Sequence, residues 1–298
     1  MKSAIIDIGS SIIKYKIYEY KNETIEPIIK NDERVGLISY REDNKLTQEG
    51  MDILLSTLES FKEYSSKLGV DCSYYYATAS LRNLENTGEV LKTVQEKLDI
   101  DITILTGHQE ADYSFNSLNM TDVPDDEGIL LDIGGGSSEI TLFKDRKVEK
   151  QESIPTGVLK IYYKHVSLLY PNKDEQKIII DDITQKIKDL NIGSYEKKYV
   201  YGIGKTFSTI KKLIEHMKIK TDTTNTIDIK LIDILLEKLS YNDKETFTPL
   251  LQVDSERIHT ILPSLLIVKA LALEFNVKKV YVCNVTLQDG IIYKIINK

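Results

Sequence analysis

A short apolar run that ends in Asp-Ile-Gly and small hydroxyl residues occurs twice in this chain of 298 residues. Residues 5–11 read IIDIGSS, and residues 130–139 read LLDIGGGSSE. A single copy is a weak motif, because an ordinary hairpin turn explains it as well as a binding loop does. Two copies, each followed by a similar series of strands and helices, predict that the chain folds as a duplicated half-fold.

The chemistry of the repeated turn suits a phosphate. Glycine lets the backbone bend tightly and bring its N–H groups close to an anion, while serine hydroxyls add donors. Ligands of open α/β sheets bind at the carboxyl ends of strands, which is where Asp7 and Asp132 are expected. Two such ends facing each other across a cleft would hold a phosphate chain from both sides, and the two carboxylates could then hold Mg²⁺.

Hydrophobic periodicity predicts an α/β chain. Strands are expected at residues 3–9, 12–20, 24–30, 72–77, 102–105, 128–132, 138–143, 147–154, 198–202 and 279–283. Helices are expected at residues 47–68, 86–98, 107–119, 156–170, 174–189, 206–217, 229–239, 254–275 and from about 286. Asn86 and Glu89 have the spacing of a capping box, and Gly69 suits a left-handed helix end. The acidic run 121–128 is the best linker, which predicts domains 1–122 and 123–298, with the terminal helix free to pack back on the first.

The charge of the chain argues against several partners. Lys and Arg total 39 against 46 Asp and Glu, so the field of the whole chain attracts neither nucleic acid polymers nor a membrane surface. The two cysteines, Cys72 and Cys283, have no metal-ligand or disulfide spacing and are expected to be buried thiols. The apolar stretch 261–275 is too short to span a bilayer, and the first residues lack the apolar core of a signal peptide. A cytoplasmic location is therefore expected.

Two rival motifs fail on spacing. Gly204-Lys205-Thr206 matches the end of a Walker A loop, but position 199 is Tyr where that loop requires Gly. Residues 135–139, GGSSE, lack the last glycine of a G-x-S-x-G nucleophile elbow. Neither a P-loop nor a serine hydrolase is supported.

Taken together, six blocks resemble the exopolyphosphatase and guanosine pentaphosphate phosphatase (Ppx/GppA) family, a branch of the actin, sugar-kinase and chaperone-ATPase superfold. The blocks are AIIDIGSSIIKYKI (4–17), YATASLRNLEN (76–86), ILTGHQEADYSF (104–115), LLDIGGGSSEITLF (130–143), YGIGKTFSTI (201–210) and the segment from RIHTILPSLLIVKAL to VTLQDGII (257–292). The resemblance implies an α/β fold of two ribonuclease-H-like domains, the short form of the family, with the active site in an interdomain cleft.

The resemblance also implies roles for individual residues. Glu110 matches the general base that activates the attacking water, and Arg82 matches an arginine that grips phosphate. Asp132 and Glu139 match the acids of the magnesium site, with K⁺ as a further candidate cation. The implied phosphate-binding residues are Asp7, Gly9, Ser10, Ser11, Thr78, Gly134, Gly135, Gly136, Ser137, Gly204 and Lys205, and Lys14 and Arg257 could extend the positive path.

Four positions depart from the family pattern: Gln109 replaces an acid, Ser11 an asparagine, Lys205 a glycine and Gln288 an arginine. These departures put substrate preference in doubt more than reaction type. The leading hypothesis is a Mg²⁺-dependent phosphohydrolase that removes the terminal phosphate of polyphosphate, guanosine pentaphosphate, or both. The alternatives are a sensor that binds guanosine tetra- or pentaphosphate without turnover and, ranked lowest, an ATP-using kinase. A homodimer through the apolar face of 254–275 is left open.

Overall fold

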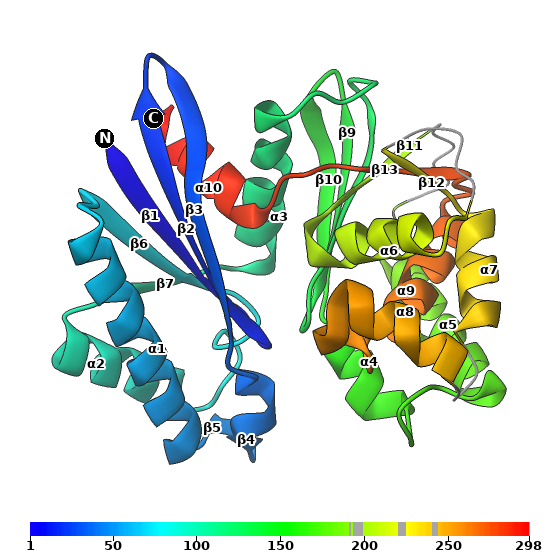
Figure 1. Cartoon of the computed structure of the whole chain (residues 1–298), viewed down its shortest axis with the longest axis horizontal. Helices are drawn as coiled ribbons and strands as arrows, with labels where there is room; N and C mark the ends of the chain where they lie inside the picture. Colours follow the sequence, from blue (N-terminus) through cyan, green and yellow to red (C-terminus); the bar gives the residue numbers. More distant parts are fainter. Residues whose placement is uncertain (191, 193–198, 220–224, 240–243, 298) are drawn as a thin grey trace. The chain divides into compact units, whose positions relative to one another are not determined.

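The computed structural model describes residues 1–190, 192, 199–219, 225–239 and 244–297. The chain divides into two compact units (Figure 1). The first unit combines Met1–Met120 with Leu287–Lys298, and the second is Thr121–Thr286. Both units are built on a mixed sheet with helices, so the expected α/β class is confirmed.

The sheet of the first unit has the strand order β3-β2-β1-β6-β7. Its strands are β1 (Lys2–Ile8), β2 (Ile12–Lys21), β3 (Thr24–Arg34), β6 (Cys72–Ala77) and β7 (Ile102–Ile104). Neighbours among the first three strands pair antiparallel, whereas β1, β6 and β7 run parallel. This is the ribonuclease-H-like order, and it makes β1 the central strand.

Helices and short turns complete the first unit. They are η1 (Leu37–Tyr40), α1 (Gln48–Lys67), α2 (Thr87–Leu98), α3 (Gly107–Asn116), η2 (Ser117–Met120) and α10 (Leu287–Ile296), with the small ladder β4 (Arg41–Glu42) and β5 (Lys45–Leu46). Side chains of β1 alternate between two cores: Ile6 and Ile8 pack with α1 and α2, whereas Ile5 packs with α10. By the same alternation, Asp7 points to the α10 side of the sheet.

The second unit repeats this order. Its sheet runs β10-β9-β8-β11-β13-β12, from strands β8 (Gly128–Ile133), β9 (Ser138–Lys144), β10 (Lys147–Ile154), β11 (Tyr199–Ile203), β12 (Thr226–Asp228) and β13 (Lys279–Val282). The pairings of β8, β9 and β10 are again antiparallel, and β8, β11 and β13 again run parallel. The predicted duplication is confirmed, with β12 as an added edge strand.

The helices of the second unit include the most apolar one of the described chain. They are α4 (Val158–His165), α5 (Lys173–Asp189), α6 (Gly204–His216), α7 (Lys230–Lys238), α8 (Lys244–Asp254) and α9 (Ile261–Glu274), with the turn η3 (Ser255–Arg257). Most side chains of α9 are buried inside the unit, so its apolar character serves the core. No helix in the described ranges is both long and apolar enough to cross a membrane.

Several expectations about elements were wrong. Asn86 does not cap α2, because its amide pairs with the main chain of Leu46 in both directions, at 2.9 and 3.0 Å. The helix expected at 254–275 begins only at Ile261, because Asp254 ends α8 and the turn η3 follows it, and β12 and α8 were not expected. The helix expected at 156–170 ends at His165, where Val166 takes an extended backbone conformation.

The two cysteines lie in different environments. Cys72 begins β6 and is exposed, so the expectation that it is buried was wrong. Cys283 is buried as expected, and that burial raises the pKa of its thiol to about 12. Position 198, the expected start of a strand, lies outside the described residues. Gly69 has φ of 65°, as expected for a left-handed helix end.

Candidate active site

The two Asp-Ile-Gly turns are closed in the same way. In the first unit the Gly9 amide donates to the Ile12 carbonyl at 3.1 Å, and in the second the Gly134 amide donates to the Ser137 carbonyl at 3.0 Å. A Cβ atom on Gly9 would lie 2.7 Å from the Ile12 oxygen, which is too close. Glycine at this position is therefore required by the turn itself.

The carbonyl oxygens of Ser10 and Ser11 in the first turn accept hydrogen bonds from the segment that follows β3. The amides of Val35 and Gly36 donate to the Ser11 oxygen at 3.1 and 2.9 Å, and the Ile38 amide donates to the Ser10 oxygen at 3.0 Å. The amides of Ser10 and Ser11 have no hydrogen-bond partner within the described residues. They are therefore available to an anion in front of the turn.

The second turn is held by the start of α4, which also follows a third strand. The amides of Val158 and Leu159 donate to the oxygens of Gly134 and Gly135, both at 3.0 Å. This packing requires Gly157, since a Cβ there would lie 2.5 Å from the Gly134 oxygen. The amides at positions 135–137 make no hydrogen bond to any described residue, which again leaves donors for an anion.

Asp7 ends β1 as a buried carboxylate, with 2% of its surface exposed. Its Oδ2 atom accepts a hydrogen bond from Lys14 Nζ at 2.8 Å, and Lys14 lies opposite it on β2. The Oδ1 atom is buried and has no partner among the described residues. A buried oxygen without a donor is unfavourable, so this atom suits a ligand or cation that reaches it.

Glu110 and Arg82, the two residues predicted to be catalytic, lie together. Arg82 Nη1 donates to Glu110 Oε2 at 3.1 Å and to the Leu105 oxygen at 2.9 Å. Glu110 lies in the first turn of α3 and is 8% exposed. The Arg82 amide donates to the Thr78 oxygen at 3.1 Å, so predicted residues from β6–α2 and from α3 meet at one place in the first unit.

Asp132 and Glu139 are direct neighbours across the β8–β9 ladder. Glu139 is 2% exposed, and its Oε1 atom accepts from Ser153 Oγ at 2.9 Å. Residues opposite each other on antiparallel strands share one face of the sheet, so both carboxylates lie on the same side. The described residues contain no group of three or more His, Cys, Asp or Glu arranged to hold a metal. Two carboxylates nevertheless fit Mg²⁺, which takes its other ligands from phosphate and water.

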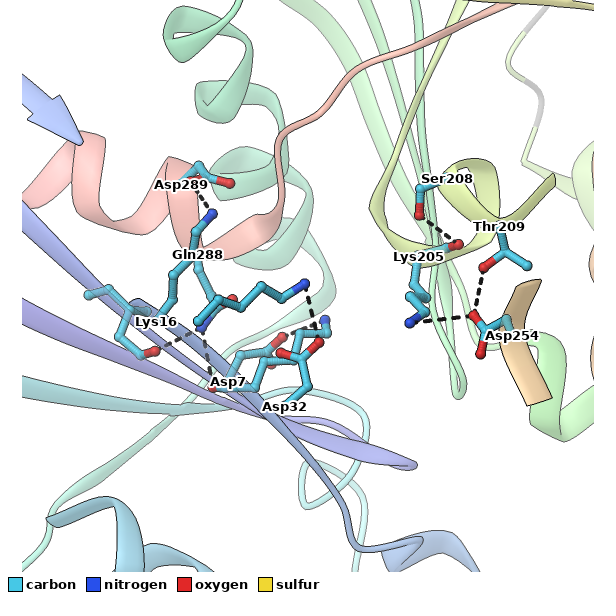
Figure 2. Close-up of polar contacts among 12 residues, drawn as sticks. Asp7, Lys16, Asp32, Lys205, Ser208, Thr209, Asp254, Gln288 and Asp289 are labelled. Atoms are coloured by element: carbon cyan, nitrogen blue, oxygen red, sulfur yellow. Dashed lines mark hydrogen bonds and ion pairs between the residues drawn. The ribbon is translucent and has the colours of Figure 1, made fainter. Parts of the chain in front are cut away.

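Gly204 brings the start of α6 close to Asp132. Its φ is 83°, and a Cβ there would lie 3.2 Å from Asp132 Oδ1. Lys205 is the next residue, and its Nζ atom lies 3.4 Å from Asp254 Oδ2. The same oxygen accepts a hydrogen bond from Thr209 Oγ at 2.9 Å (Figure 2). The phosphate contact expected of Lys205 stays a prediction. Asp254 was missed in the sequence, where no motif singles it out.

Two of the departures from the family pattern have structural partners. Gln109 completes a capping box on α3. Its side-chain Oε1 atom accepts from the main-chain amide of Thr106 at 2.9 Å, and its main-chain amide donates to Thr106 Oγ at 3.1 Å. Gln288 Nε2 donates to the oxygens of Ile5 at 2.8 Å and Lys14 at 3.2 Å. The contact of Gln109 stabilises the start of α3, and the contacts of Gln288 hold α10 against β1 and β2. Both side chains therefore have a structural role.

The fold and these turns define a class: an α/β protein of two ribonuclease-H-like units, each with a glycine turn directly after a first strand that carries an aspartate near its end. The model of the Ppx/GppA phosphatase family matches residues 16–298, and the chain belongs to this family. The expected enzyme class, a phosphoanhydride hydrolase, is confirmed at this level.

Individual relatives are distant but nearly complete in coverage. Exopolyphosphatase 1 of Mycobacterium tuberculosis is 21% identical over 306 residues, covering 99% of this chain and 88% of the relative. A crystal structure of an exopolyphosphatase from Cytophaga hutchinsonii superposes with a TM-score of 0.86 at 18% identity, covering 100% of this chain and 98% of that one. The Ppx/GppA family member of Aquifex aeolicus gives 0.83 at 20% identity, with the same coverage. These structures confirm the fold.

Proposed function

We propose that this enzyme removes the terminal phosphate of inorganic polyphosphate by attack of a water molecule that Glu110 orients and deprotonates. Guanosine pentaphosphate, which ends in the same type of phosphoanhydride, is the second candidate substrate. The observation that carries the proposal is the contact of 3.1 Å between Arg82 Nη1 and Glu110 Oε2 in the first unit. A guanidinium that grips the terminal phosphate would thereby hold it next to the base.

The ion pair also gives Arg82 a role before substrate arrives. Arg82 uses Nη1 for both Glu110 and the Leu105 oxygen, and its side chain is 17% exposed. A guanidinium has five N–H donors, so donors remain for phosphate oxygens while the contact with the carboxylate persists. The same arginine can therefore bind the phosphate and keep Glu110 on the side of the attacking water.

Charge on the phosphate oxygens has to be balanced by donors and cations. The amides and hydroxyls of Ser10 and Ser11 supply fixed donors in the first unit, and the amides of the second turn supply fixed donors in the second unit. Asp132 and Glu139 would hold Mg²⁺, which when bound neutralises charge on the equatorial and leaving oxygens. Hydrolysis by water then needs no covalent nucleophile, in agreement with the failed serine-hydrolase motif.

The decisive experiment is phosphate release with Mg²⁺ from short polyphosphate, long polyphosphate and guanosine pentaphosphate. Glu110→Gln should lower kcat by at least roughly a hundredfold, because it removes the proton acceptor but keeps the side-chain size. The matched control is Glu63→Gln, which changes an exposed glutamate paired with Lys67 and should leave kcat unchanged. No release from any of the three substrates, or full activity in Glu110→Gln, would overturn the proposal.

The sensor alternative was motivated by Gln109 and Gln288, which replace charged residues of the family pattern. Gln109 Oε1 and Gln288 Nε2 bond to main-chain atoms of the first unit, which gives each side chain a structural role. Their presence does not argue for a site that binds without turnover. Calorimetry with guanosine tetraphosphate, measured beside the release assay, separates tight binding from hydrolysis.

A further inference from the structure

The loop that carries Arg82 is held by a residue that no motif singled out. Arg41, the first residue of β4, donates from Nη2 to the Ala79 oxygen at 2.8 Å and to the Ser80 oxygen. The Ser80 hydroxyl in turn donates to the oxygen of Ile8, directly before the first turn. One guanidinium therefore fixes two successive carbonyl groups just ahead of Arg82.

Arg41 belongs to the same segment, residues 35–41, that holds the first turn. The amides of that segment bind the Ser10 and Ser11 oxygens, and its last residue binds the loop after β6. The turn and the loop are therefore fixed through their carbonyl oxygens by one short piece of chain. This arrangement leaves their donor groups, including the Arg82 side chain, on the other side.

The environment of Arg41 argues that this contact is its main role. Burial lowers the pKa of its guanidinium, and its Nε atom is buried without a partner in the described part of the chain. No carboxylate among the described residues forms an ion pair with it. A desolvated cation whose charge is met by main-chain oxygens makes strong hydrogen bonds, and moving the loop would leave it unsatisfied.

We propose that Arg41 is a positioning residue for phosphate binding and hydrolysis: it fixes the loop 78–82 so that Arg82 reaches both Glu110 and the substrate phosphate. The inference rests on the proposed function, because it assigns Arg41 an effect on that site. Arg41 itself does not touch the substrate. Its effect passes entirely through Arg82.

Arginine is needed here for geometric reasons. Both hydrogen bonds leave from one nitrogen, Nη2, which the rigid planar guanidinium holds in place, whereas a lysine offers a point charge on a flexible stem. A buried lysine also loses its proton more readily, since desolvation lowers its pKa. Arg41→Lys should therefore behave more like Arg41→Met than like the wild type.

The test is a double-mutant cycle of Arg41→Met and Arg82→Ala, with Arg146→Met as the control because Arg146 pairs with Asp126 on the surface of the second unit. Arg41→Met should lower kcat/KM roughly tenfold, mainly through kcat, and the control should not. In the Arg82→Ala background the same change should have an effect of less than roughly twofold, since the residues act in series. Additive losses in the cycle would overturn the proposal.

Folding effects are separated from positioning by two further measurements. Thermal unfolding of each variant gives the fraction of the protein that is folded at the assay temperature, and activity is expressed per folded molecule. Guanidinium chloride at millimolar concentration should restore activity to Arg41→Ala, whose vacated space admits the free cation, but not to Arg82→Ala combined with Arg41→Ala. Restoration of the double variant, or none in the single one, would contradict a role through Arg82.

The same cycle distinguishes the fate of this inference from that of the proposed function. If the wild type binds tripolyphosphate in calorimetry but releases phosphate from none of the three substrates, the proposed function fails, and the cycle on the dissociation constant still decides the role of Arg41. If the wild type hydrolyses polyphosphate but Arg41→Met matches it, only the inference fails. A wild type that does not bind tripolyphosphate and hydrolyses none of the three substrates would end both.

Discussion

At the scale of single residues, Asp182 gives the clearest pH dependence. Burial raises the pKa of this carboxyl group, but hydrogen bonds from Lys186, His165 and Lys164, at 2.9 to 3.2 Å, outweigh it and hold the pKa at about 2. A pKa depressed in the folded state stabilises the fold above the unfolded value of 3.8 and loses that effect as the pH falls towards 2. Asp182→Asn should therefore lower the stability at pH 7 by about 1 kcal/mol after solvent screening.

The measurement is thermal unfolding of Asp182→Asn and wild type at a series of pH values between 7 and 2.5. The difference in Tm should be constant down to about pH 4 and shrink below it. The neighbouring Asp181→Asn is the control, because Asp181 is exposed. A Tm difference that grows on acidification would show that the assigned hydrogen bonds do not stabilise the charged carboxylate.

A second prediction at this scale concerns Gln109. Gln109→Glu should keep kcat within about twofold and leave stability equal or slightly higher, because glutamate accepts from the Thr106 amide equally well and favours a helix N-terminus. Gln109→Ala should lower the free energy of unfolding by about 0.5–1 kcal/mol, since the Thr106 amide loses its acceptor. Denaturant titrations and the release assay check both. A large gain of kcat in Gln109→Glu would instead assign this position to the chemistry.

Residues of the site differ in how far the sequence predicted them. The turns were predictable because the same apolar strand, Asp-Ile-Gly and serine pattern occurs twice, and Glu110 with Arg82 followed from the family blocks. Asp254 and Arg41 were not, because their roles depend on contacts with Thr209 and with Ala79, far away in the sequence. The contacts of Gln109 and Gln288 were not predicted either, since their partners are main-chain atoms that no motif records.

At the scale of elements, the docking of α10 on α3 depends on one glycine. A Cβ at Gly290 would lie 1.7 Å from the Tyr113 oxygen and 2.9 Å from the Ser117 nitrogen, both of them backbone atoms. The helix would have to move away as a whole, so Gly290→Ala should lower the free energy of unfolding by about 3 kcal/mol. Urea unfolding monitored by circular dichroism measures this.

Gly88→Ala provides the matched control for that prediction. Gly88 lies in α2 with nothing within 4 Å of its Cβ position, so alanine should be neutral or stabilise by about 0.5–1 kcal/mol. Equal destabilisation by both substitutions would show that helix propensity, and not the contact with α3, governs position 290.

Elements with strong periodicity were predicted well, whereas junctions were not. The strands of both sheets except β12, and helix α1, follow directly from apolar spacing. The later start of α9, at Ile261, was missed, because the Asp254 carboxylate contacts Thr209 and Lys205 at the end of α8 and no sequence pattern records those contacts. Asn86 stands at the position of a helix cap, but its side-chain amide forms hydrogen bonds with the main chain of Leu46. This contact links β5 to the start of α2.

At the scale of the whole molecule, duplication explains why the same turn occurs twice. In each unit the first strand, the turn and the segment after the third strand form one arrangement, in which the carbonyl groups are bound and the amides are left for an anion. What the units do not share is their ending. The first unit is completed by the last helix of the chain, whose Leu287 and Ile291 pack against Ile5 of β1.

This connectivity predicts that removing the C-terminus destabilises the N-terminal unit. A chain ending at Thr286 loses the contacts of Gln288 with the Ile5 and Lys14 oxygens and the buried ion pair of 2.6 Å between Lys16 and Asp289. Lys16 would lose the carboxylate that pairs with it, and Ile5 would lose the apolar cover of Leu287 and Ile291. Hydrogen exchange by mass spectrometry should show β1 and β2 exchanging at least roughly tenfold faster, while β8 and β9 keep their protection. A chain ending at Ile296 is the control. Equal loss of protection in both units would mean that they do not unfold separately, and no loss in β1 would mean that α10 is not part of the first unit's core.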